Sequence, residues 1–218
     1  MAQIFGRGAD TWFRLVLWGA VLAVVAFFLL VGGYVRSDWR TEVGHAPEQP
    51  VPFSHEHHVG GLGIDCRYCH TSVETAATAG FPPMDTCMTC HSQIWTGAPM
   101  LEPVREGYAR DVALRWIRVH DLKDFAYFDH SVHLSAGVGC ETCHGRVDRM
   151  PLIRQVAPLT MQWCLDCHRD PAPALRPREA VFEMGWRPPA DRRTQGQDLI
   201  EAYGIEVGNL DTCYVCHR

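Results

Sequence analysis

Ten cysteines, arranged as five pairs with two residues inside each pair, constrain this chain of 218 residues more than any other feature. The pairs are Cys66 and Cys69, Cys87 and Cys90, Cys140 and Cys143, Cys164 and Cys167, and Cys213 and Cys216. The histidines that directly follow these pairs are His70, His91, His144, His168 and His217. Because two cysteines at this spacing lie about one helical turn apart, each pair can hold one prosthetic group at two points.

The sequence Cys-x-x-Cys-His is typical of c-type haem attachment, in which two thiols form thioethers with the haem and the histidine binds the iron. The strongest alternative is structural zinc, since the 17 residues from Cys69 to Cys87 and the 20 from Cys143 to Cys164 fit four-cysteine sites. Such a site does not use the following histidine, and the fifth pair would have no partner. A thioredoxin-like redox site needs one pair, not five. The sequence therefore predicts five covalently bound c-type haems.

Seven of the twelve histidines lie outside these motifs and could bind the other face of the irons. Two Phe-x-His-x-x-His strings each place two imidazoles three residues apart, so one turn could direct them toward two haems. The predicted distal ligands are His55, His58, His130, His133 and His120. Met150 and Met161 are the alternatives to His120, because methionine is a common axial ligand in cytochromes c. His45 and His57 are expected to be solvated surface residues.

The region that follows residue 45 contains an internal repeat, residues 53–91 and residues 128–168. Each copy has the Phe-x-His-x-x-His string, a glycine-rich turn and two Cys-x-x-Cys-His motifs, which indicates duplication of a two-haem unit. The fifth motif, residues 213–217, stands apart. With about 35 residues per haem, residues 46–218 are expected to form a mostly irregular domain of short α-helices packed around haems.

Two segments between the motifs also carry predictions. The spacing of apolar residues predicts a helix over residues 102–120. Residues 171–189 are rich in proline and arginine, and we expect them to be irregular and to lie on the surface.

Residues 1–45 are predicted to be a membrane anchor with one transmembrane helix at about residues 12–35. The segment from Leu15 to Val35 has no charged residue and would be about 31 Å long as a helix, which matches the hydrocarbon thickness of a bilayer. A cleaved signal peptide is the alternative, but the apolar stretch is long for one and no small-x-small cleavage site follows it. Because c-type haem is attached outside the energy-converting membrane, we expect a single-pass protein of the cytoplasmic membrane with its N-terminus inside.

The charge of the chain argues against a nucleic-acid partner. Its formal net charge is −5, and Lys123 is the only lysine. Nucleic-acid binding requires a clustered basic patch, and the sequence has none.

Residues 53–91 and 119–168 resemble the pentahaem cytochrome c component of alternative complex III. The strings that carry this resemblance are residues 66–74 (CRYCHTSVE), residues 91–95 (HSQIW) and residues 163–169 (WCLDCHR), together with the anchor and the proline-rich segment after it. The resemblance implies an electron-transfer subunit, not itself an enzyme, within a membrane complex that oxidises quinol, usually menaquinol. It also implies other membrane subunits as partners, and a periplasmic cytochrome, a copper protein or a terminal oxidase as the acceptor.

Two other functions compete with this one. A stand-alone membrane quinol dehydrogenase that feeds a periplasmic reductase places its first haem motif soon after the anchor, whereas some 30 residues separate Val35 from Cys66 here. A multihaem nitrite reductase needs an iron with an open distal position, often beside an altered motif. All five motifs here are complete, and distal histidines are plentiful.

Overall fold

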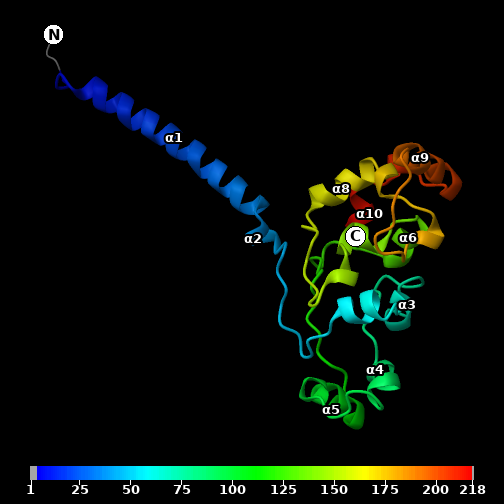
Figure 1. The fold of residues 1–218 in the computed structure, drawn as a ribbon. Coiled ribbons are helices and arrows are strands. Elements are labelled where there is room, and N and C mark those ends of the chain that lie inside the picture. The colour runs from blue at the N-terminus through cyan, green and yellow to red at the C-terminus, as the bar shows by residue number, and fades with distance from the viewer. Residues whose placement is uncertain (1–3, 218) are drawn as a thin grey trace. The chain divides into compact units, whose positions relative to one another are not determined.

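The computed structural model describes residues 4–217 and divides the chain into two compact units, one ending at Glu42 and one beginning at Val43 (Figure 1). The first unit contains α1 (Ala9–Arg36) and α2 (Asp38–Thr41). The apolar helix expected at about residues 12–35 is present and is slightly longer at both ends. An 18-residue stretch of this helix has a mean hydropathy of 2.7, and none of its residues is buried, so the helix is long and apolar enough to cross a membrane.

Short helices joined by irregular segments make up the second unit. Its α-helices are α3 (Cys66–Cys69), α4 (Met84–His91), α5 (Glu102–Arg110), α6 (His130–Ser135), α7 (Cys140–His144), α8 (Met161–Arg169), α9 (Arg192–Tyr203) and α10 (Cys213–Cys216). A π-helical turn, η1 (Glu56–Gly61), and five 3-10 turns, η2 (Pro99–Leu101), η3 (Val147–Arg149), η4 (Ala172–Ala174), η5 (Arg178–Ala180) and η6 (Val207–Asn209), complete the set. Within residues 4–217 the only β pairing is one isolated bridge between Val138 and Leu175. The expected fold class is confirmed.

The apolar core of this unit includes two small clusters that lie next to cysteine motifs. One cluster is Val51, Met84, Leu101 and Val104, against which Cys87 packs. The other is Val73, Leu134 and Val181, against which Cys140 packs. Each cluster therefore joins a cysteine motif to segments distant in sequence.

The helix expected over residues 102–120 was too long, because α5 ends at Arg110. Asp111 adopts a left-handed conformation with φ of 54°, and Val112 donates its N–H to the carbonyl of Gly107. Beyond this point the side-chain amide of Gln49 pairs with the backbone of Ile117 through two hydrogen bonds of 2.9 and 3.0 Å. Pairing with a distant segment replaced the local helical pattern, which the periodicity alone had favoured.

The expectation that residues 171–189 lie on the surface was also wrong for the first part of this segment. Leu175 is 1% exposed and Arg176 is 3% exposed. The N–H of Arg176 bonds to the carbonyl of Gly137, and the carbonyl of Val181 accepts from the N–H of Cys140. The segment is irregular, as expected, but it is buried because it packs against the third cysteine motif.

Candidate haem-binding sites

Each of the five cysteine pairs lies on a single helical turn. In α3, α7 and α10 the pair occupies almost the whole helix, whereas in α4 and α8 it lies in the last turn of a longer one. The carboxylate of Asp65 caps α3 by accepting from the N–H of Arg67 at 2.8 Å. Thr160 caps α8 through its hydroxyl. The turn brings both thiols of a pair to one side, which double attachment of a haem requires.

The histidines of the motifs are oriented by backbone carbonyls. Nδ1 of His70, of His168 and of His217 each donates over 2.8 Å, to the carbonyls of Gly80, Leu210 and Phe125 respectively. Nδ1 of His91 makes a longer contact of 3.4 Å with the carbonyl of Ile94. Because a carbonyl can only accept, Nδ1 carries a proton in each of these rings, and Nε2 is the nitrogen that remains to bind a metal.

Three of the predicted distal histidines show the same arrangement. Nδ1 of His58 donates to the carbonyl of Ser54 over 2.8 Å, and Nδ1 of His133 donates to that of Asp129 over 2.7 Å. Nδ1 of His130 donates to the carbonyl of Ala77 over 2.8 Å. In metal-binding histidines, a hydrogen bond from the ring nitrogen that does not bind the metal fixes both the orientation of the ring and its tautomer.

Distances between imidazole rings fit a metal held between two histidines. The ring centroids of His58 and His91 are 6.3 Å apart, and those of His133 and His168 are 6.1 Å apart. The rings of His130 and His144 are 6.3 Å apart and nearly parallel, at 10°. Two imidazoles on opposite sides of one metal, with metal–nitrogen bonds of about 2 Å, place their centroids roughly 6 Å apart.

His120 lies beside the third motif. Its Nδ1 is 3.3 Å from Nδ1 of His144, and the two ring centroids are 4.4 Å apart, too close for a metal between the rings. Its Nε2 is buried and has no hydrogen-bond partner in the described part of the chain, so this nitrogen is available to a metal on its other side. His217, in the fifth motif, packs against Phe125, with ring centroids 6.0 Å apart.

Burial keeps several of these histidines neutral. It lowers the pKa of His55 to about 4, with the nearby His70 and His58 adding to the effect. It lowers the pKa of His144 to about 3, with His120 and His130 contributing. The pKa of His133 is lowered mainly by burial as well. Neutral imidazole is the form that binds metals, so these rings suit iron at neutral pH.

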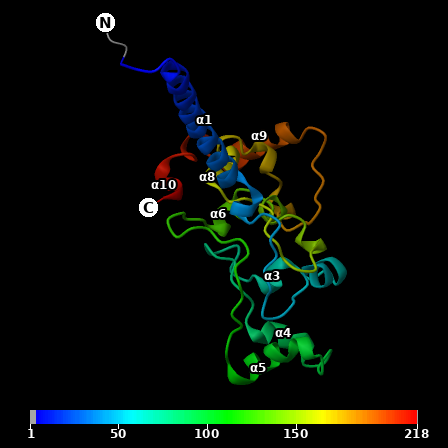
Figure 2. The ribbon, with the colours of Figure 1, turned by 90° about the vertical axis from the view of Figure 1, so that its left-hand side faces the viewer.

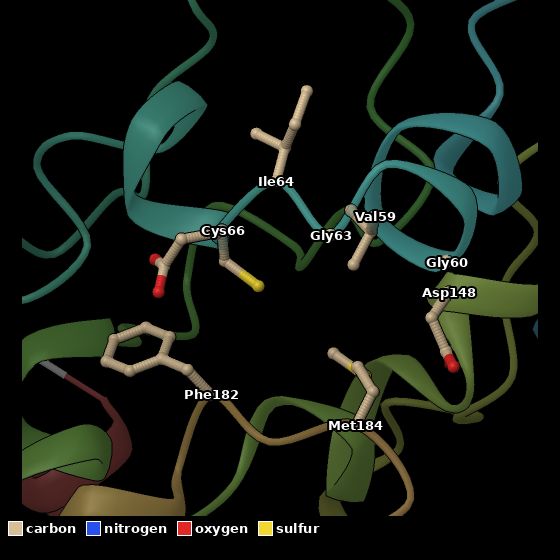
Figure 3. Close-up of a pocket in the computed structure, with 9 residues that line it drawn as sticks. Val59, Gly60, Gly63, Ile64, Cys66, Asp148, Phe182 and Met184 are labelled. Atoms are coloured by element: carbon tan, nitrogen blue, oxygen red, sulfur yellow. The ribbon is translucent and has the colours of Figure 1, made fainter.

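A cavity of about 330 Å³ opens beside the first motif, and the sulfur of Cys66 points into it (Figure 3). Its apolar lining includes Ile64, Phe182 and Met184. On the far side Gly60 lies against the backbone of Asp148, where a side chain would not fit. The carboxylates of Asp65 and Asp148 line the same cavity. Its apolar side chains, next to an attachment cysteine, suit contact with one face of a porphyrin.

The remaining sequence candidates occupy different surroundings. Met150 is 2% exposed and belongs to the core, while Met161 is 64% exposed. His45 and His57 are exposed, as expected. The sequence reasoning missed Arg176, whose buried guanidinium bonds to Glu141 of the third motif over 2.9 Å. No motif marks this arginine, which lies 35 residues from its partner.

Two similarities to known proteins bear on the family. Residues 126–218 match the family described as cytochrome c7 and related cytochrome c. The multiheme cytochrome c subunit of menaquinone reductase from Nitratidesulfovibrio vulgaris is 30% identical over 180 residues, which cover 78% of this chain and 77% of that protein.

The fold and the sites together define a c-type cytochrome, in which short helices present thiol pairs and carbonyl-oriented histidines. With the relative just described, the chain belongs to the family of multihaem cytochromes c, and its haem is bound covalently. It is an electron-transfer cytochrome, and its helix α1 is long and apolar enough to cross a membrane.

Proposed function

We propose that this chain binds five c-type haems and relays electrons as a subunit of a membrane quinol:acceptor oxidoreductase of the alternative complex III type. The observation that carries the proposal is the set of facing histidines. His58 with His91, His133 with His168, and His130 with His144 have separations suited to a metal between two imidazoles. Five complete motifs supply the attachment points.

When bound, haem iron supplies a one-electron Fe(III)/Fe(II) couple. The protein's own contribution is to hold each group in place through two thioethers and to present neutral imidazoles with a fixed tautomer. A histidine on both faces leaves no open position for a substrate, so the chain itself is proposed to be a conductor and not an enzyme. Bis-histidine ligation also favours lower potentials than histidine–methionine ligation, which suits exchange with menaquinol.

The proposed location is the cytoplasmic membrane, with α1 as a single-pass anchor and the haem unit on the outer side. Covalent haem attachment takes place on that side, so the N-terminus would be inside. Lipid around α1 and the other subunits of the complex are the proposed membrane partners. A periplasmic cytochrome c, a copper protein or a terminal oxidase is the proposed acceptor.

The relative from Nitratidesulfovibrio vulgaris supports a second candidate, in which electrons run in the opposite direction and reduce menaquinone. The two candidates use the same haems and differ in the partners of the complex. Incubating the purified complex with a menaquinol analogue and, separately, with a reduced periplasmic cytochrome and menaquinone tests the direction. Faster haem reduction by the quinol supports the first candidate, and faster quinone reduction supports the second.

The haem count is tested by mass spectrometry of the intact chain, produced with its maturation machinery. Five haem additions are expected, and four or fewer would contradict the proposal. A variant with Cys213→Ser and Cys216→Ser is the matched control, and it should carry four haems.

Near-infrared magnetic circular dichroism tests the ligand set, because it separates bis-histidine from histidine–methionine haem. We expect five low-spin bis-histidine haems, with His120 among the ligands. A methionine band that disappears in Met150→Leu or in Met161→Leu would replace His120 by that methionine.

The conducting role is tested on the chain purified with its anchor but without partner subunits. A soluble menaquinol analogue is expected to reduce its haems slowly, since the proposed quinol site belongs to another subunit. Rapid reduction that a quinol-site inhibitor blocks would favour the stand-alone quinol dehydrogenase.

A further inference from the structure

We infer that the five haem motifs form a line in the order second, first, third, fourth, fifth, so that the second and fifth motifs are the two ends. The inference rests on the proposed five haems and adds the route that electrons take between them. It follows from contacts between motifs, taken one junction at a time.

The second and first motifs touch through residues that lie inside them. The hydroxyl of Tyr68, between the two cysteines of the first motif, is 2.9 Å from the hydroxyl of Thr89, between those of the second. The distal histidines span the same junction. His58 faces His91 of the second motif, and His55, one turn earlier, lies near His70 of the first.

The first motif is also in contact with the third. Val73, three residues after the first motif, lies in one apolar cluster with Leu134 and Val181, and Cys140 of the third motif packs against this cluster. Ala77, which follows the first motif, accepts at its carbonyl from both N and Nδ1 of His130, over 3.1 and 2.8 Å. That histidine faces His144 of the third motif. The first motif therefore has neighbours on two sides.

One short helix joins the third and fourth motifs. α6 carries His130, which faces His144 of the third motif, and His133, which faces His168 of the fourth. Because the two ligands are one helical turn apart, the two irons that they bind must be close neighbours.

The fourth motif meets the segment that leads into the fifth. Nδ1 of His168 donates to the carbonyl of Leu210, and the guanidinium of Arg169 pairs with the carboxylate of Asp211 over 3.2 Å. Only one residue separates Asp211 from Cys213, the first cysteine of the fifth motif. These contacts place the fifth motif next to the fourth.

Figures 1 and 2 show the same succession, from α4 at one end through α3 and α6 to α8, with α10 beside α8. The two halves of the repeat thus meet head to head, with their first motifs together and their second motifs facing outward. The order along the chain is reversed within the first half. An electron that enters at the second motif must pass the first before it reaches the third.

Iron positions in the haem-loaded full-length protein test the order directly. Cryo-electron microscopy, or anomalous diffraction at the iron edge, should place the iron of the first motif next to those of the second and third. An iron of the second motif closer to the third than to the first would overturn the inference. A count of fewer than five irons would instead contradict the proposed function.

Redox titration of two variants tests the same order in solution. His58→Met alters a ligand of the second, terminal haem, and His133→Met alters a ligand of the fourth, internal haem. Methionine raises the potential of the altered haem, so this haem is already reduced, with one positive charge fewer, when its neighbours titrate. Because charge acts most strongly on close neighbours, His58→Met should shift one further haem potential, and His133→Met should shift two. Two shifted neighbours for His58→Met would overturn the order. The methionine band in magnetic circular dichroism verifies that each ligand change took place.

Discussion

The two halves of the repeat hold their distal histidines in almost the same way. Phe53 stacks on His58 with ring centroids 4.4 Å apart at 23°. Phe128 stacks on His133 at 4.4 Å and 26°. The edge contacts of these phenylalanines with the earlier histidine of each pair are also alike, at 4.9 and 4.8 Å. The phenylalanine of each string therefore sets the angle between two imidazoles.

The backbone and the surroundings of the two halves differ. The first pair begins a π-helical turn, η1, whereas the second lies on the α-helix α6, which the carboxylate of Asp129 caps. Arg67, inside the first motif, forms an exposed ion pair with Asp65. Glu141, at the same place in the third motif, forms a buried pair with Arg176. The two halves therefore hold their distal histidines in the same geometry, but they pack against the rest of the fold through different contacts.

The largest difference in stability between the two halves should come from the ion pairs Arg176–Glu141 and Arg67–Asp65. Arg176→Met removes the buried cation and leaves Glu141, whose side chain is 16% exposed, with only the more distant cation of Arg146 at 3.9 Å. This change should lower the free energy of unfolding by about 3 kcal/mol. Arg67→Met removes an exposed pair and should lower it by less than about 1 kcal/mol. Urea unfolding of the haem-loaded proteins measures both. Adding Glu141→Gln to Arg176→Met should recover part of the loss, and equal losses in the two single variants would contradict the comparison.

A glycine behind each distal pair should be the next most sensitive position. A Cβ at Gly137 would lie 2.5 Å from the carbonyl oxygen of Arg176, at a φ of +85°, so Gly137→Ala should cost about 3 kcal/mol. A Cβ at Gly60 would overlap the carbonyl oxygen of Asp148, and Gly60→Ala should cost about 2 kcal/mol.

The control is Gly61→Ala in the same turn as Gly60, where the nearest atom would be 3.7 Å away. Its midpoint in thermal unfolding should match that of the unmodified protein or exceed it. If Gly60→Ala were as stable as Gly61→Ala, the packing of η1 against η3 would be wrong.

The smallest effect should come from the residues that start the two turns. The carboxylate of Asp129 accepts from the N–H of Ser131 over 2.9 Å, so Asp129→Ala should cost about 1 kcal/mol. The hydroxyl of Ser54 accepts one N–H over 3.1 Å, and Ser54→Ala should cost less. Because both distal histidines bond to backbone carbonyls, neither change should alter the low-spin signal, and its loss would show that these side chains also hold the ligands.

The sequence by itself determined the chemistry of the protein. Five Cys-x-x-Cys-His motifs define local turns that need no distant partner, so their number, their haem type and the two-haem repeat could be predicted from the sequence. The apolar helix α1 could be predicted for the same reason, because its length and composition are local properties.

Only the tertiary structure decided which segments, distant in sequence, are in contact with one another. The extended run after Asp111 depends on Gln49, and the burial of Arg176 depends on Gly137 and Glu141, all of them distant in sequence. The spatial order of the motifs also depends on the tertiary structure. Along the chain, the second motif lies between the first and the third. Contacts such as that of His130 with Ala77 reverse this, because packing joins surfaces irrespective of their separation in sequence.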